Sequence, residues 1–206
     1  MAPLPSGFYD GDTVEIARRL LGKLIVRQYR GELLACRITE TEAYVGRCDK
    51  ACHAYGYRKT ARTATLFTPP GRAYIYLIYG MYHCLNFVTE PEGEPAAVLI
   101  RGGEPVLGME TMARLRFGRP VEQLTPSQKK HFLDGPGKLC KALALTRGEN
   151  GLDLTRGETL WVTDDPGELG LTLPPETRPV AAGKRIGIDY AQEAVDFPWR
   201  FYYEQK

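Results

Sequence analysis

The stretch that decides the fold is KLIVRQYRGELLACRITETEAY, residues Lys23–Tyr44. Two β-prone runs, Lys23–Tyr29 and Leu33–Tyr44, flank the dipeptide Arg30-Gly31, and this arrangement predicts a β-hairpin. Period-two alternation along the second run places Leu34, Cys36, Ile38, Glu40, Glu42 and Tyr44 on one face. We therefore expect an apolar strand face that leads directly into carboxylates.

The rest of the chain mixes helices with strands that are joined mainly by hairpins. Asp12 and Glu15 predict the start of a capped helix that ends near Gly22. A second hairpin is expected at Tyr79 and Gly80. The other predicted strands are Ala73–Ile78, Met81–Val88, Val98–Arg101, Thr159–Thr163, Val180–Ile188 and Trp199–Tyr203, with helices around Val106–Arg116 and Gly137–Leu145. This order favours a single α+β domain over residues 1–206.

Composition excludes several classes of protein. Hydrophobic residues make up 43% of the chain and charged residues 25%, which is ordinary for a globular domain and excludes a disordered chain. No apolar run approaches the roughly 18 to 20 residues of a membrane span, and Met1–Gly7 lacks the pattern of a secretory signal. Five irregularly spaced cysteines suit a reducing compartment. We expect a cytoplasmic protein.

Basic residues are concentrated in two segments. Residues Arg47–Arg72 include six basic and one acidic residue, and Arg101–Arg147 include nine basic and four acidic, a net of +5 in each. From Gly148 onward there are six basic and eleven acidic residues, a net of −5. The folded molecule could present a positive face that suits a phosphate backbone, although charge scattered over the surface fits the same counts.

Three basic residues are the candidates for contact with DNA phosphates. Arg58 and Arg62 belong to the first basic segment, and Lys138 ends the turn Asp134–Gly137 before an apolar helix. That turn offers free backbone amides, which suit an anion, although most such turns only begin a helix.

Glu40 and Glu42 are the first candidates for chemistry. At about 3.3 Å per residue their Cα atoms lie about 6 to 7 Å apart, and such a pair could act as the acid and base of an inverting sugar hydrolase. Solvent-facing glutamates at a sheet edge have the same spacing. Tyr44 and His53 join this site only if the loop between them folds back, which the spacing does not decide.

Aromatic residues are concentrated in one run, with Tyr74, Tyr76, Tyr79 and Tyr82 within nine residues. Tyr74 and Tyr76 share a strand face and could line a pocket. Tyr79, beside a glycine, could form an exposed wedge between base pairs. Aromatic stripes are more often core, but four hydroxyls need partners or solvent. We expect at least one or two of these rings on an accessible surface.

A metal site is the remaining chemical alternative. Cys48, Cys52 and His53 are close in sequence, but a structural zinc needs a fourth ligand and usually a second close pair. The other cysteines, Cys36, Cys84 and Cys140, are isolated in the sequence. We expect no metal.

Taken together, these motifs resemble those of the alkyladenine DNA glycosylase family, the 3-methyladenine or alkylpurine glycosylases of bacteria and animals. The resemblance runs from about Leu20 to Leu145 and resumes around Val180–Tyr203. It rests on four co-linear motifs: Glu40–Tyr44 with His53, Tyr76–Tyr82 with Asn86, Val98–Arg101, and Gly135–Leu143. It implies an α+β domain with a curved, largely antiparallel sheet, flanking helices and a protruding β-hairpin that enters the DNA minor groove.

The resemblance also implies roles for single residues. Glu42 matches the general base and Arg101 the arginine that positions the attacking water. Tyr79 matches the intercalating tyrosine, and Glu40 receives no catalytic role. The base-binding residues would be Tyr44, His53 and Tyr76, which sandwich the flipped base, Asn86, which discriminates against guanine, and Leu99, which shapes the pocket.

The function that the resemblance implies is base-excision repair. The expected enzyme flips alkylated or deaminated purines out of double-stranded DNA and hydrolyses the N-glycosidic bond, as a monomer and without a metal or cofactor. No lysine occupies a nucleophile position, which implies that the enzyme has no strand-cleaving lyase activity. The alternative is a catalytically silent module that binds damaged DNA.

Overall fold

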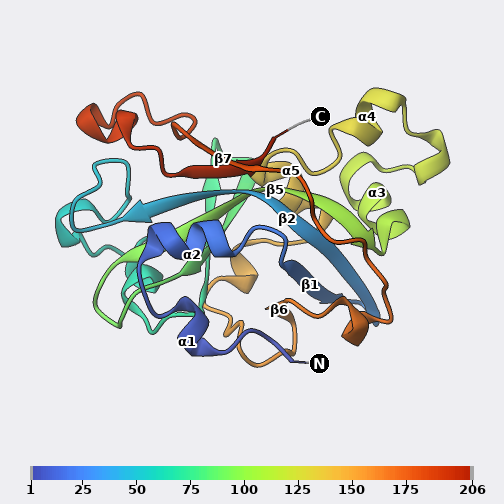
Figure 1. Ribbon diagram of the computed structural model, residues 1–206, viewed down its shortest axis with the longest axis horizontal. Helices are drawn as coiled ribbons and strands as arrows, with labels where there is room; N and C mark the ends of the chain where they lie inside the picture. The colour runs from blue at the N-terminus through green and yellow to red at the C-terminus, as the bar shows by residue number, and fades with distance from the viewer. Residues whose placement is uncertain (1, 205–206) are drawn as a thin grey trace.

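Two long strands, β2 (Glu32–Val45) and β5 (Ala96–Leu107), form the middle of the sheet. In the computed structural model, which describes residues 2–204, both strands curve along their length (Figure 1). They pair antiparallel from Ala35, opposite Leu107, to Val45, opposite Ala96. The order of the sheet is β3-β4-β5-β2-β1-β6, with β8 paired to β2 and β7.

The remaining elements are short. The strands are β1 (Leu24–Tyr29), β3 (Ala73–Ile78), β4 (Tyr82–Val88), β6 (Leu160–Thr163), β7 (Val180–Gly183) and β8 (Arg200–Tyr203), and every pairing is antiparallel. The α-helices are α1 (Ser6–Tyr9), α2 (Thr13–Arg19), α3 (Met109–Phe117), α4 (Pro126–Lys130) and α5 (Pro136–Ala142). The 3-10 helices are η1 (Tyr55–Tyr57), η2 (Ala64–Phe67), η3 (Val121–Gln123), η4 (Arg147–Glu149), η5 (Pro166–Leu169) and η6 (Gln192–Asp196). The predicted α+β class with a curved antiparallel sheet is confirmed.

Both predicted hairpins are present, and each turns on a pair of residues with positive φ. The pair is Arg30 (49°) and Gly31 (85°) between β1 and β2, and Tyr79 (53°) and Gly80 (69°) between β3 and β4. Positive φ at both central residues is what the type I′ hairpin turn requires. The second hairpin protrudes, and Tyr79 at its tip is 81% exposed.

One hydrophobic core joins the sheet to α2, α3 and α5. The first of these helices starts where predicted, because the Asp12 side chain accepts a hydrogen bond from Glu15 N at 2.9 Å. The core-facing residues of the helices include Ile16 and Ala17 of α2, Met112 of α3, and Leu139 and Cys140 of α5. Within residues 2–204, every helix falls short of the length and hydrophobicity that a membrane span requires.

The predicted face of β2 is wrong, because its apolar and acidic residues do not point the same way. The β2 side chains in the main core are Leu34, Cys36, Ile38 and Ala43. The change from even to odd positions falls between Ile38 and Thr41, where the register with β5 shifts. A β-bulge turns the side chains that follow it onto the other face. Glu42 therefore projects away from the main core.

Two predicted boundaries are also wrong. Val106 and Leu107 continue β5 instead of starting a helix, since both pack on the small cluster around Trp161. β7 ends at Gly183 rather than Ile188, and residues 184–191 leave the sheet as a loop. The other predicted strands and helices are present.

The junction between β5 and α3 generates a test of the packing. Gly108 has φ 72°, and a Cβ there would lie 2.5 Å from Leu34 Cδ2. We expect Gly108→Ala to lower the free energy of unfolding by about 2 to 4 kcal/mol, from backbone strain and overpacking together. Urea denaturation measures the loss. Gly118→Ala is the matched control, since φ is 70° but nothing lies within 4 Å; equal losses would show that packing contributes nothing.

Candidate active site

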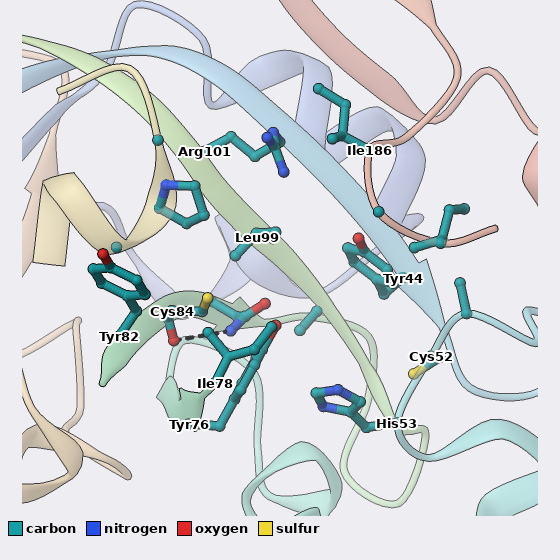
Figure 2. A pocket seen from close by; sticks show the side chains of 18 of the residues that line it. Tyr44, Cys52, His53, Tyr76, Ile78, Tyr82, Cys84, Leu99, Arg101 and Ile186 are labelled. Carbon is teal, nitrogen blue, oxygen red and sulfur yellow. Dashed lines mark hydrogen bonds between the residues drawn. The ribbon is translucent and has the colours of Figure 1, made fainter. Parts of the chain in front are cut away.

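A cavity of about 500 Å³ opens beside the β3–β4 hairpin (Figure 2). Its walls come from β2, β3, β4, β5, the loop that follows β2, the start of α5 and the 184–191 loop. Six of the seven predicted catalytic and base-binding residues line it together: Tyr44, His53, Tyr76, Asn86, Leu99 and Arg101. Its volume lies within the usual range for small-molecule sites, about 300 to 1,000 Å³.

Aromatic rings form two walls of this cavity. Figure 2 shows Tyr44 on one side and Tyr76 with His53 on the other. The ring centroids of His53 and Tyr76 are 4.6 Å apart in an edge-to-face arrangement. Nδ1 of His53 lies 3.1 Å from the hydroxyl oxygen of Tyr74, a hydrogen bond that orients the imidazole. The walls can therefore hold a flat ring between them.

His53 is neutral at physiological pH. Burial lowers its pKa to about 4, and the nearby Arg62 guanidinium acts in the same direction. Arg62 lies 5.0 Å from the centroid of the Tyr76 ring. The imidazole thus presents an uncharged aromatic surface to the cavity.

Glu42 is fully buried behind the cavity wall, and three donors surround its carboxylate. The Tyr44 hydroxyl donates to Oε2 at 2.7 Å, the Ile186 backbone N–H donates to Oε1 at 2.8 Å, and Arg101 Nε lies 3.5 Å from Oε1. Burial raises the pKa of Glu42, and Arg101, Tyr44 and the Ile186 amide oppose this rise in that order. A carboxylate offers about four lone-pair positions, so it can accept a further hydrogen bond from water.

Glu40 is committed to two arginines. Its Oε1 accepts hydrogen bonds from Arg101 Nε at 3.1 Å and from Arg200 Nε at 2.5 Å. Glu40 therefore orients Arg101 towards Glu42, and this arrangement disfavours the alternative in which Glu40 and Glu42 act as an acid and base pair.

Asn86 is buried and its amide has a fixed orientation. Nδ2 donates to the backbone oxygens of Tyr74 at 3.0 Å and Cys84 at 3.3 Å. Within residues 2–204 the side-chain oxygen accepts no hydrogen bond, so it is the atom that a ligand can use. The cavity thus offers a directional acceptor.

The predicted DNA-contacting residues lie around the mouth or outside it. Tyr79 and Lys138 line the cavity, but Lys138 Nζ already donates to Asp134 at 2.6 Å. Arg58 and Arg62 are exposed and form no ion pair within residues 2–204. Their contacts with DNA stay predictions.

Sequence reasoning missed the 184–191 loop. Ile186, Gly187, Ile188 and Tyr190 line the cavity, although the sequence predicts that three of them belong to a strand or its end. The available signal was Gly187, which has φ 74° and interrupts the apolar alternation.

The cysteines that suggested a metal alternative do not form a ligand cluster. Cys48 is exposed and Cys52 is buried. Over residues 2–204, no three His, Cys, Asp or Glu side chains converge as metal ligands would.

Comparison with known proteins identifies the family. A family model described as Methylpurine-DNA glycosylase (MPG) matches residues 7–206. Relatives provisionally named 3-methyladenine DNA glycosylase occur in Alkaliphilus oremlandii (51% identity, 95% of this chain, 92% of the relative) and Clostridium perfringens strain 13 (49%, 95%, 92%). A third, from Bacillus cereus strain AH820, is 48% identical over 97% of this chain and 95% of its own. The chain therefore belongs to the methylpurine-DNA glycosylase family, DNA-repair enzymes that hydrolyse N-glycosyl bonds.

Proposed function

We propose that the protein excises alkylated or deaminated purines from duplex DNA, by flipping the nucleotide into the cavity and hydrolysing its N-glycosidic bond with a water that Glu42 activates. The observation that carries the proposal is the buried Glu42 carboxylate, held by Tyr44, Ile186 and Arg101 directly behind a slot with aromatic walls.

Flipping is required because a stacked base hides its glycosidic bond. Extrusion costs a few kcal/mol and leaves a gap in the duplex. Tyr79 is suited to fill that gap, since its ring stands at the tip of the hairpin with 81% of its surface exposed. We assign the hairpin to the minor groove, and Arg58, Arg62 and Lys138 to contacts with the flanking phosphates.

Recognition follows from the chemistry of the slot. Stacking on aromatic side chains is worth about 1 to 3 kcal/mol per base and offsets part of the extrusion cost. Electron-rich rings attract an electron-poor alkylated purine more than a normal one, and a neutral His53 does not repel it. Asn86 then contacts the edge of the base, and Leu99 limits the shapes that fit the cavity.

Hydrolysis needs a water on the sugar side of the flipped base. Cleavage of the bond leaves an oxocarbenium-like sugar, and the Glu42 carboxylate takes a proton from the attacking water. Arg101 holds that water and the carboxylate together. These steps use neither a metal nor a cofactor, and we assign them to a monomer that acts in the cytoplasm on nucleoid DNA.

Glu42→Gln tests the base. It keeps the shape of the side chain but removes the proton acceptor, so we expect base release to fall by about 10²- to 10⁴-fold. Single-turnover release from a duplex with one methylated purine measures this. Affinity for the same duplex should stay within a few-fold. Glu40→Gln is the control, with a smaller loss through Arg101. Release by Glu42→Gln at the wild-type rate would refute the role as base, and no release by the wild type would favour the silent binding module.

Tyr79→Ser tests the wedge. We expect affinity for a duplex with a flipped lesion to fall about 10-fold or more, in line with the energy of one stacked ring, while affinity for undamaged DNA changes little. Fluorescence anisotropy with both duplexes measures the difference. Tyr57→Ser, an exposed tyrosine outside the hairpin, should change neither affinity. Equal losses on both duplexes after Tyr79→Ser would argue against intercalation.

The chemistry also predicts what remains after base release. Because water rather than an amine attacks the sugar, the product is an intact strand with an abasic site. Borohydride added during turnover should trap no covalent protein–DNA complex, and gels should show no strand cleavage before alkali. A borohydride-dependent crosslink would reveal an amine nucleophile.

A further inference from the structure

Behind the cavity lies an ion pair that the proposed chemistry does not use. Arg185 and Asp49 are both fully buried, and the guanidinium donates to the carboxylate at 2.5 Å and 2.8 Å. Asp49 lies in the loop after β2, and Arg185 is the second residue after β7. The pair therefore joins two segments that are 136 residues apart.

Further hydrogen bonds hold each partner in place. Arg185 also donates to the backbone oxygens of Ala43 at 2.7 Å and Ala194 at 3.1 Å. Asp49 accepts from the backbone N–H groups of Val45 at 3.3 Å and Ala51 at 2.9 Å. These bonds satisfy both carboxylate oxygens of Asp49 and both terminal nitrogens of Arg185, which a buried ion pair needs, while Nε of Arg185 has no partner within residues 2–204.

The pair touches three parts of the cavity. The Arg185 guanidinium lies 4.7 Å from the centroid of the Tyr44 ring, one of the two walls. The next residue, Ile186, donates its N–H to Glu42. The Asp49 segment continues directly to His53 on the opposite wall. The ion pair thus contacts one wall directly and is connected through short stretches of chain to the other wall and to one of the three donors to the buried carboxylate.

We propose that the Asp49–Arg185 pair is a positioning unit of the active site, which holds the Ile186 amide on Glu42 and the Tyr44 ring against the slot. It acts through these groups and does not touch the reacting atoms. The proposal rests on the proposed role of Glu42 as the base.

We expect the pKa of Glu42 to change when the contact between Asp49 and Arg185 is weakened. The groups that face Glu42 are Arg101 from β5, Glu40 and Tyr44 from β2, and Arg185 with the Ile186 amide from the loop. The Ile186 N–H bond favours the carboxylate over the acid. Losing that bond raises the pKa of Glu42, so less of the base is ionised at low pH. The acid limb of the rate profile then moves to higher pH.

Arg185→Lys is the informative variant, because lysine keeps the charge but loses the planar fork. We expect the acid limb of the single-turnover pH–rate profile to rise by about one pH unit, which lowers the rate near its foot by about 10-fold. Above the limb, the rate should recover towards that of the wild type. A limb at the wild-type position would overturn the proposal.

Arg27→Lys is the matched control. Arg27 is another buried arginine, 2.9 Å from Glu149 and remote from the cavity. It should lose thermal stability without any movement of the pH profile. An equal shift of the pH–rate profile in both variants would show that Arg185 only stabilises the fold in general.

Amide hydrogen exchange provides a readout that needs no activity, and its first part uses the wild type alone. In the wild type, the backbone amides of Val45, Ala51 and Ile186 should exchange through one common opening. The reason is that one ion pair holds together the two segments that carry them. In Arg185→Lys their protection should fall together. Exchange of Ile186 independently of the other two would refute the proposal. If the wild type releases no base, the proposed function fails, while the exchange pattern still decides whether the pair holds the loop.

Discussion

The proposed role of Glu42 requires its carboxylate to stay ionised without exposure to solvent, and this requirement governs the architecture of the site. Burial raises the pKa of its carboxyl group, and only nearby donors oppose that rise. The donors come from three places: Tyr44 on the same strand, Arg101 on the neighbouring strand and the Ile186 amide on a distant loop. Because no single element could supply all three, the site exists only when the sheet is complete and the loop is closed.

The irregular pairing of β2 and β5 lets one strand serve both the core and the site. Before the bulge the even-numbered residues fill the core, and after it they face the cavity. Glycines on β5 permit the close approach: a Cβ at Gly103 would lie 2.9 Å from the backbone oxygen of Arg37, and one at Gly102 would lie 3.4 Å from the Glu40 Cβ. A regular strand would have directed Glu42 into the hydrocarbon core, where an ionised carboxylate is strongly destabilised.

Features that depend on neighbouring residues could be predicted from the sequence. Features that depend on residues far apart in the chain could not. The dipeptides Arg30-Gly31 and Tyr79-Gly80 marked both hairpins, and Asp12 marked a helix start, because turns and caps depend on neighbouring residues. Alternation alone could not reveal the bulge near Thr39, which depends on glycines in another strand. It also could not reveal why the loop at Arg185 closes, since its partner Asp49 lies far away in the chain. The resemblance to the glycosylases supplied site residues that neither spacing nor composition could select.

The order of the sheet places the exposed Tyr79 and the buried Glu42 near each other, as the proposed function requires. The hairpin that carries Tyr79 is formed by β3 and β4, which lie next to β5 with Arg101, which lies next to β2 with Glu42. Only one strand therefore separates the hairpin from the strand of the carboxylate, and Leu99 of β5 pairs with both Asn86 and Glu42. Under the proposed function, a nucleotide displaced at the hairpin tip would have a short path between the aromatic walls to the Glu42 carboxylate. Since hydrogen bonds already hold the walls and the carboxylate in place, the proposed mechanism can use the energy of DNA binding to extrude the nucleotide rather than to order the site.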